Sequence, residues 1–515
     1  MNVLFDINVF IDLLVEREPH AVDSRHAFNQ LLSAGAKAWV YAGSVQTLRY
    51  QVSSEIDRRL PGISKKASLR RASGMLDMFL QDFDWLAALS GEGVGIFTED
   101  DPEDAQLVRA LARLGEDALL LTRDAALLQA CPQARSPRQV CEGALPNTQP
   151  GIDFIDLKTQ QAALRPQIER NLHRVLHHGC YILGPEVKEL EERLAAFVGV
   201  KHCIAVSSGT DSLLIAMMAL GIGHGDEVIT VPYTWISTAE MIALLCATPV
   251  FVDIQPDTWN MDPNLLEAAI TPKTKAIMPV GIFGQTADMT AINAIADKHG
   301  LPVIEDAAQS FGATHQGKRS GSLATVGSTS FFPSKPLGGY GDGGAVFTDD
   351  DELAQAMRQI HVHGQAKKHH HPILGINGRL DALQAAVVLA KLDRFEAEIA
   401  ARQRVADRYL TGLKSKDLTP PVLGRGNTSV WAQFTVLSPE RDALAGKLKN
   451  AGIPSVSYYA VPLHRQPVFS GLGHPEGDFP VTETVAREGL SLPMSPDLDR
   501  EDAERVVAAV CDGRD

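Results

Sequence analysis

The chain has 515 residues, well beyond the roughly 250–300 at which a single hydrophobic core stops growing, so at least two domains are expected. Hydrophobic residues make up 45% and charged residues 22%, which is typical of a globular protein and excludes collagen-like, coiled-coil and disordered chains. The net charge of −15 argues against a surface that binds nucleic acid or anionic membrane throughout, although a local basic patch remains open.

The first 145 residues alternate strand and helix patterns. A short apolar strand is predicted at 2–5 and another at 118–122, with helices at 21–34, 67–89 and 104–113. This alternation predicts a small α/β domain with a parallel sheet. Because Asp6 and Asp12 interrupt the apolar N-terminal run and no basic stretch precedes it, the run does not read as a secretion signal.

The cysteines and the apolar stretches of the chain indicate in which compartment the protein is expected. The six cysteines form no C-x-x-C pair, so neither a zinc site nor a disulfide framework is indicated. No stretch approaches the roughly 20 apolar residues that span a membrane. We therefore expect a reduced, cytoplasmic protein with no membrane partner.

A proline-rich stretch at 136–151 separates two periodic regions. After it come amphipathic helices at 159–176 and 185–197, then strands at 203–206, 227–231, 249–253, 276–280 and 302–305 alternating with helices. The prediction is a small N-terminal domain (1–145), a linker (146–151), a large α/β domain (152–400) and a small C-terminal α+β domain (401–515).

Acidic residues gather at strand ends and at one helix start in the first domain. Asp6 ends the first strand, Asp124 ends the strand at 118–122, and acids crowd 99–104. Carboxylates brought together at one sheet edge repel unless a divalent cation such as Mg²⁺ or Mn²⁺ neutralises them. The segment 58–71 carries six basic residues and either contacts an RNA backbone or forms a solvated helix face.

These patterns, FDINVFIDLLVEREP, EDAQLVRAL and LLLTRD, resemble PIN domains, the fold of many toxin-type ribonucleases. The resemblance implies that Asp6, Asp104 and Asp124 hold the metal, with Asp101 or Glu103 nearby, and that metal-activated water attacks a phosphodiester. The stretch 44–49, SVQTLR, lacks a glutamate that is usual there. A metal-dependent ribonuclease and a degenerate domain used for RNA contact or assembly both remain open.

Four motifs in the second part carry chemistry. SSGTD at 207–211 opens a helix and can bind an anion, although such residues also serve as plain helix caps. EDAAQ at 305–309 ends a strand, where open α/β sheets place ligands. SFFPSKP at 330–336 sets Lys335 among aromatics before a glycine-rich run, which suits Schiff-base chemistry. GINGRLD at 375–381 leads into an apolar helix.

In this order the motifs resemble the sugar aminotransferases of the DegT/StrS type, which use pyridoxal 5′-phosphate (PLP) on the fold called fold type I. The resemblance implies that Lys335 carries the cofactor and moves the proton, while Asp306 pairs with the pyridinium nitrogen. The further cofactor contacts implied are Gly209, Thr210, Trp235, Gln309, Ser330 and Asn377. Trp235 would stack on the ring or be an ordinary core residue. Because Asn377 reaches the neighbouring subunit's cofactor in this family, a homodimer with shared active sites is implied.

Related PLP-dependent sugar dehydratases carry histidine in place of the lysine, so Lys335 favours transamination from glutamate to a nucleotide-linked keto-sugar. The motif details look most like enzymes that aminate the 3-keto group of a UDP-linked N-acetyl hexuronic acid, a step of cell-surface polysaccharide (lipopolysaccharide O-antigen) biosynthesis. Arg379 would then bind the substrate carboxylate, and His464 would lie near the substrate or be structural. The tract 369–371, three histidines, reads as a polar loop rather than a metal site. An RNA-processing protein with a vestigial transferase scaffold is the rival hypothesis.

Overall fold

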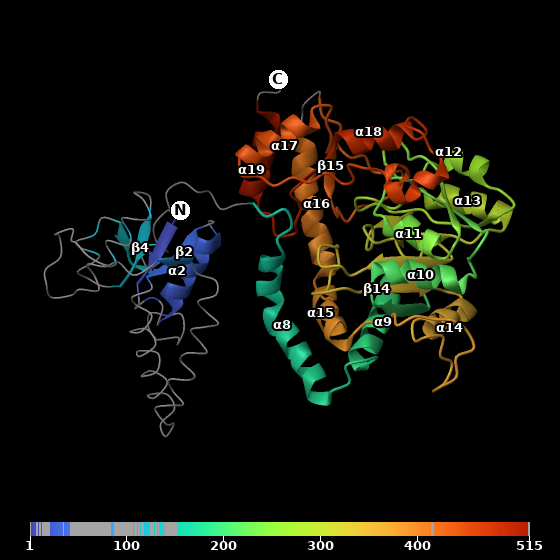
Figure 1. Cartoon of the computed structure of the whole chain (residues 1–515), viewed down its shortest axis with the longest axis horizontal. Coiled ribbons are helices and arrows are strands. Elements are labelled where there is room, and N and C mark those ends of the chain that lie inside the picture. Colours follow the sequence, from blue (N-terminus) through green and yellow to red (C-terminus); the bar gives the residue numbers. More distant parts are fainter. Residues whose placement is uncertain are drawn as a thin grey trace. The chain divides into compact units, whose positions relative to one another are not determined.

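The computed structural model divides the chain into two compact units, Met1–Gly151 and Ile152–Asp515 (Figure 1). It describes residues 2–6, 9, 12, 21–33, 36–41, 84–86, 107, 111, 114, 118–123, 128, 131, 133–137, 140, 152–413 and 417–512. Each unit is considered by itself.

The first unit contains a five-stranded sheet in the order β3-β2-β1-β4-β5, with every neighbouring pair parallel. Its elements are β1 (Asn2–Phe5), α2 (Ala21–Ser33), β2 (Lys37–Tyr41), β3 (Asp84–Leu86), β4 (Leu119–Leu121) and β5 (Ala134–Arg135). Leu4 and Leu120 lie in its core with Leu107 and Leu111. The predicted parallel α/β arrangement is therefore present, whereas the helix predicted over 67–89 is wrong at 84–86, which is a strand. The likeness to PIN domains stays a prediction.

The second unit is built on a seven-stranded sheet. Its strands are β6 (His202–Val206), β7 (Glu227–Thr230), β8 (Thr248–Phe251), β9 (Thr274–Ile277), β10 (Ile304–Asp306), β13 (Val326–Ser330) and β14 (Gly344–Thr348). The part β8-β7-β9 and the part β10-β13-β14-β6 are joined beside β9 and β10 by two isolated parallel bridges, Ile277 to Val303 and Val280 to Asp306. Only β14 runs antiparallel to its neighbours. The five strands predicted here are confirmed. Their ends lie within two residues of the predicted ones, except that β9 ends three residues early.

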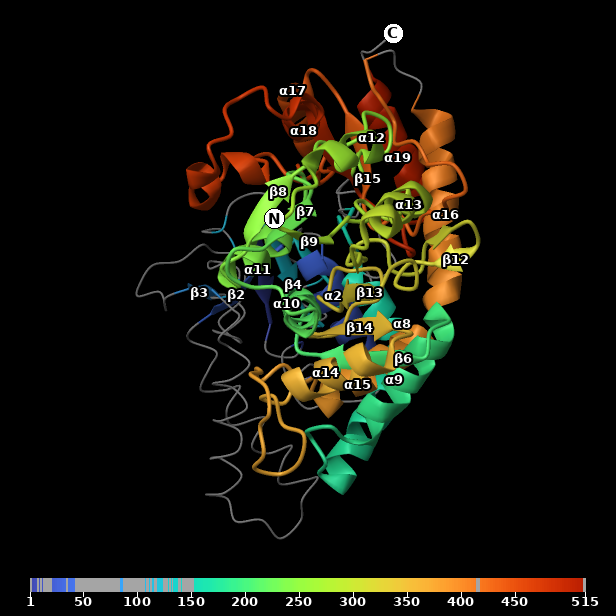
Figure 2. The same ribbon diagram turned by 90° about the vertical axis from the view of Figure 1, so that its right-hand side faces the viewer.

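Helices cover both faces of this sheet (Figure 2). In β6, Cys203 and Ala205 pack with α9 (Pro185–Val198) and α15 (Ala382–Leu392). Ile204 and Val206, one residue out of phase, pack with α10 (Gly209–Ala219) and α14 (Asp351–Ile360). Because successive side chains of a strand point to opposite faces, a strand buried on both faces is apolar, as residues 203–206 of β6 (CIAV) are.

The sheet region contains further helices and two short strands. They are α8 (Leu157–His178), α11 (Ser237–Leu244), α12 (Pro263–Leu266), η3 (Glu267–Ala269), α13 (Met289–His299), β11 (Thr314–His315) and β12 (Lys318–Arg319). Helices α8 and α9 are followed by the C-cap residues Gly179 and Gly199, whose left-handed backbone conformation favours glycine. Both helices lie where the sequence predicts them.

The C-terminal region packs around the antiparallel pair β15 (Phe434–Leu437) and β16 (Gly489–Leu492). Its helices are α16 (Phe395–Gly412), α17 (Arg441–Asn450), η4 (Leu463–Arg465), η5 (Pro467–Leu472), α18 (Pro480–Glu488) and α19 (Arg500–Cys511). The boundary predicted at 400/401 falls inside α16, and the predicted linker lies outside the described residues. In the part of the chain that the structure describes, no helix is both long and apolar enough to cross a membrane.

Candidate active site

A cavity of about 420 Å³ opens at the carboxyl edge of the large sheet. Strands β6, β7, β10 and β13 point the same way, and the segments that follow each of them supply its walls. Open α/β sheets bind ligands at this edge because loops from several strands converge there. The lining residues used below are Gly209, Thr210, Trp235, Ser237, Thr238, Asp306, Gln309, Ser330, Lys335, Gln433 and Tyr459.

Lys335 and Asp306 face this cavity together. Burial lowers the pKa of the Lys335 amine, and the carboxylate of Asp306 partly opposes that change. Burial likewise raises the pKa of Asp306, which is 6% exposed, while hydrogen bonds from Ala308 and Thr238 and the charge of Lys335 favour its anion. A lysine whose free amine is favoured by desolvation is prepared to attack a carbonyl carbon.

The start of α10 forms one end of the cavity. The Ser208 side chain caps the helix by accepting the N–H of Asp211 at 3.0 Å. A Cβ on Gly209 would lie 2.5 Å from the Ser330 Cβ, so only glycine lets these two backbones approach so closely. The Thr210 hydroxyl lies 2.9 Å from that of Ser237. Hydroxyls gathered at a helix N-terminus suit a phosphate group.

Aromatic and amide groups form another wall. Trp235 is 56% exposed, so it is not a core residue, and its ring is 6.1 Å from that of Tyr459. Gln309 Oε1 accepts the Phe283 N–H at 3.0 Å, and its Nε2 donates to the Tyr459 hydroxyl at 3.2 Å. These bonds fix the amide, whose second N–H is left for a ligand. Together with Asp306, Lys335 and the start of α10, the wall fits a planar, phosphorylated cofactor such as PLP.

His464, for which the sequence left open a position near the substrate or a structural role, is not among the residues that line this cavity. It is 3% exposed, and its Nε2 lies 3.0 Å from Glu483 Oε1, which also accepts the Gly477 N–H. Burial lowers the pKa of His464, with Glu483 opposing. In this structure, the histidine belongs to a polar network beside α18.

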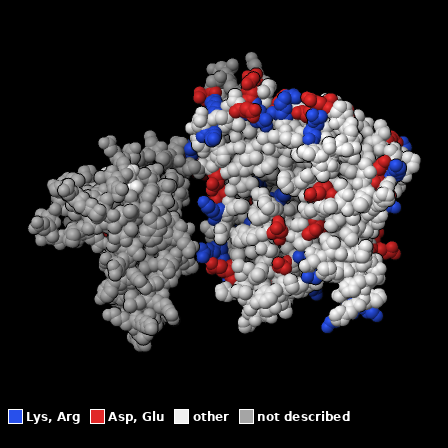
Figure 3. Space-filling view, in the orientation of Figure 1, with Lys and Arg blue, Asp and Glu red and all other residues white. Residues whose placement is uncertain are grey.

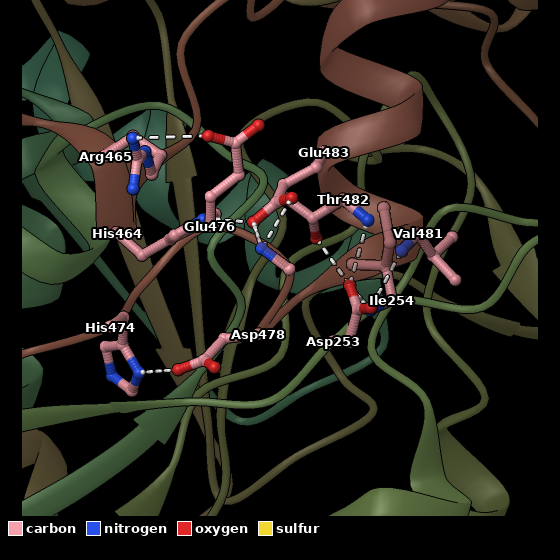
Figure 4. Close-up of polar contacts among 11 residues, drawn as sticks. Asp253, Ile254, His464, Arg465, His474, Glu476, Asp478, Val481, Thr482 and Glu483 are labelled. Carbon is pink, nitrogen blue, oxygen red and sulfur yellow. Dashed lines mark hydrogen bonds and ion pairs between the residues drawn. The ribbon is translucent and has the colours of Figure 1, made fainter.

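A separate group of hydrogen bonds ties the start of α18 to the segment that follows β8 (Figure 4). Asp253, which follows β8, accepts the N–H groups of Val481 and Thr482 at 3.0 Å each and the Thr482 hydroxyl at 2.7 Å. A carboxylate at these N–H groups satisfies donors that the first helical turn leaves unpaired. The C-terminal region, which carries Tyr458 and Tyr459, is thereby fixed against the sheet.

Asn377 and Arg379 also lie outside the cavity lining. Asn377 is exposed, and its backbone pairs with that of Val362. Arg379 is half-buried, its backbone pairs with Val206 at the end of β6, and its Nε has no partner among the described atoms.

The predicted metal site is only partly described. Asp6 is buried and accepts the Thr122 hydroxyl at 2.7 Å, while Asp104 and Asp124 lie outside the described residues, as do 44–49 and 58–71. The histidines at 369–371 are exposed. Where side chains are described, no group of three metal-binding residues gathers.

Several residues that line the cavity could not be identified from sequence motifs. Thr238 and Ser237 look like ordinary helix-start residues, and Gln433 and Tyr459 lie more than 90 residues beyond the lysine motif. Only folding brings them to the carboxyl edge, so a motif search within one segment misses them.

Known proteins share this architecture. Residues 163–511 match the model of the DegT/DnrJ/EryC1/StrS aminotransferase family. A UDP-2-acetamido-2-deoxy-3-oxo-D-glucuronate aminotransferase from Pseudomonas aeruginosa is 56% identical over 359 residues, covering 70% of this chain and 99% of the relative. A UDP-N-acetyl-3-dehydro-alpha-D-glucosamine 3-aminotransferase from Acidithiobacillus ferrooxidans is 42% identical over 359 residues, with 70% and 97% covered.

Solved structures agree. An aminotransferase of this family from Brucella abortus has 43% identity and a TM-score of 0.69, covering 70% of this chain and 99% of its own. DesV from S. venezuelae has 42% identity and a TM-score of 0.69, with 70% and 98% covered. The predicted fold type I architecture is thus confirmed for the second unit, and the chain belongs to the DegT/DnrJ/EryC1/StrS family of aminotransferases.

Proposed function

We propose that the second unit uses PLP to transfer an amino group from glutamate to the 3-keto carbon of a UDP-linked 2-acetamido-hexuronic acid. The observation that carries the reaction type is the pairing of Lys335 with Asp306 in one cavity that begins at a helix N-terminus. The 56% identity to the Pseudomonas aeruginosa enzyme supports the choice of sugar.

The residues of the cavity divide the work of holding the cofactor. When bound, PLP supplies a ring that withdraws electrons from the carbon bearing the transferred amino group. Asp306 would keep the ring nitrogen protonated, and Lys335 would be the base that moves the proton between the amino-bearing carbon and the cofactor. Gly209, Thr210 and Ser330 would hold the phosphate. Trp235 would cover a ring face, and Gln309 would donate to the phenolic oxygen.

A second copy of the chain completes the site in this proposal. Asn377 is exposed and outside its own chain's cavity, as expected of a residue that serves a neighbour. The adjacent run Tyr181–Leu183 is about half exposed, and Ile182 pairs with Asp381 near the same motif. An exposed apolar run is suited to burial between subunits.

We further propose that Arg379 binds the sugar carboxylate. Its guanidinium can form two parallel hydrogen bonds with a carboxylate. We propose that His464 acts on the substrate only indirectly, because it lies outside the cavity lining and contacts Glu483 of α18.

A spectroscopic experiment tests the reaction. Purified protein incubated with PLP should gain a visible absorbance band that shifts when glutamate is added, and Lys335→Ala should lose this response. Mass spectrometry of the keto-sugar product separates the rivals, because amination adds nitrogen whereas a dehydratase removes water. A protein that never gains a chromophore would refute the assignment and favour the RNA-related rival.

For the first unit, we propose a PIN-like domain in which Asp6, Asp104 and Asp124 hold Mg²⁺ or Mn²⁺ and act on or contact RNA. Its support is the sequence motifs and the position of Asp6 at the end of β1 in a parallel sheet. RNA cleavage that requires Mn²⁺ and disappears in Asp6→Asn combined with Asp124→Asn is expected of an active nuclease. Cleavage that survives the double substitution would show the metal assignment to be wrong.

A further inference from the structure

Asp306 has hydrogen-bond partners on both carboxylate oxygens. Oδ1 accepts the Ala308 N–H at 3.1 Å, and Oδ2 accepts the Thr238 hydroxyl at 2.9 Å. The first partner is a backbone group that no substitution removes. The second comes from α11, 68 residues away in sequence, and Thr238 is only 1% exposed although it touches the cavity.

The direction of this hydrogen bond is fixed by chemistry. An ionised carboxylate only accepts, so Thr238 must donate its single hydroxyl proton to Asp306. The Thr234 hydroxyl, 3.3 Å from that of Thr238, then has to be the donor in its own contact. The three side chains form a chain of donors, Thr234 to Thr238 to Asp306, that ends on the anion. All three are buried, where a hydrogen bond to a charge is strengthened because water does not compete.

The segment that carries Thr238 also supports two other parts of the cavity. The backbone N–H of Thr238 donates to the Trp235 carbonyl at 3.3 Å, and neighbouring Ser237 contacts Thr210 at the start of α10. One helical turn therefore contacts the aromatic wall, the phosphate end and Asp306. A change at Thr238 should act mainly on Asp306, because its hydroxyl makes neither of the other two contacts.

We propose that Thr238 is a positioning residue that orients the Asp306 carboxylate toward the cofactor ring and holds it as an anion. This inference rests on the proposed function. Its consequence is that a threonine with no sequence signal sets how firmly the ring nitrogen stays protonated, and so how well the ring accepts electrons.

The test compares four variants of the full chain. Thr238→Val keeps the side-chain shape but removes the donor, Thr238→Ala removes it in a smaller side chain, and Thr238→Ser keeps it. Thr230→Val is the matched control, because the Thr230 hydroxyl is also buried but donates to the Met278 carbonyl, outside the cavity lining. Each variant is measured for PLP affinity of the apoprotein, the pH dependence of the visible band, and the rate of the spectral change with glutamate alone.

The loss of one hydrogen bond to a charged group predicts a reduction of about 10- to 100-fold in the glutamate rate for Thr238→Val and Thr238→Ala. We expect the pH at which the band changes to shift as well, with weaker PLP binding. Thr238→Ser should recover to within a few-fold, and Thr230→Val should match the parent in band and pH profile.

The outcomes separate this inference from the proposed function. A parent protein that does not respond to glutamate overturns the proposed function itself. A responsive parent whose Thr238→Val and Thr238→Ala variants keep its PLP affinity, pH profile and glutamate rate overturns the role of Thr238 alone. Should Thr238→Val fail to fold, Thr238→Ala and Thr238→Ser decide the question between them.

Discussion

Burial disfavours the charged forms of Lys335 and Asp306. The charge of each residue favours the charged form of the other. Burial lowers the pKa of the lysine and raises that of the aspartate, and the attraction between them works against both shifts. Burial is the largest influence on the pKa of both groups, and Asp306 has two further hydrogen bonds that favour its anion. The free amine is therefore more accessible at neutral pH than on a solvated lysine, and this is the form that attacks an aldehyde.

This balance predicts the pH dependence of PLP capture by the apoprotein. The pH at which the capture rate is half-maximal should lie below about 10.4, the pKa typical of a solvated lysine, because the buried amine loses its proton at a lower pH. Asp306→Asn should lower that midpoint further, since the carboxylate raises the pKa of Lys335. Stopped-flow absorbance against pH measures both, with Nα-acetyl-lysine as the solvated reference. An upward shift in Asp306→Asn would contradict the proposed electrostatics.

At the scale of elements, the start of α10 and the end of β13 meet through Gly209 and Ser330. The contact leaves no room for a Cβ at position 209. The segments come from distant parts of the chain and meet because β6 and β13 flank β14 in the sheet. The glycine serves close backbone approach and not an unusual backbone angle.

Gly209→Ala is expected to weaken PLP binding about 5- to 150-fold, because overpacking a tight contact costs about 1–3 kcal/mol and here displaces Ser330. The loss is measured by titrating apoprotein with PLP. Gly223→Ala is the matched control, because a Cβ there meets nothing within 4 Å. Equal PLP affinity in the two variants would show that the close approach of Gly209 to Ser330 does not contribute to PLP binding.

At the scale of the whole molecule, charges of both signs are interspersed on the face of the second unit seen in Figure 3. This agrees with a small-molecule enzyme rather than a surface dedicated to nucleic acid. Asn377 is exposed and lies outside the cavity of its own chain. Its proposed role therefore depends on assembly.

Mixing inactive variants tests shared active sites. When Lys335→Ala and Asn377→Ala proteins exchange subunits in equal amounts, half the dimers are mixed, and each has one site with both native residues. About a quarter of the sites, and of the activity, should therefore return. No recovery, despite subunit exchange confirmed by mass, would mean that Asn377 serves its own chain. A fully active Asn377→Ala protein would remove it from the site.

Much of the second unit could be predicted because its signals are local. Apolar runs indicated the strands, amphipathic periodicity indicated α8 and α9, and the motifs around Asp306 and Lys335 indicated the cofactor edge. The exposure of Trp235 and the position of His464 could not be predicted, because an aromatic or a histidine in a loop has the same sequence appearance whether it lines a cavity or packs beneath one.

The amino-acid sequence was enough to identify the family of the second unit and the residues of its motifs, since these are encoded in short segments with fixed chemistry. Its length was enough to indicate more than one domain. The hydrogen bond from Thr238 to Asp306, the contact of Tyr459 with Gln309 and the pairing of His464 with Glu483 outside the cavity depend on tertiary packing. These contacts join residues 19 to 150 positions apart, and their partners are selected by how the sheet and its helices pack.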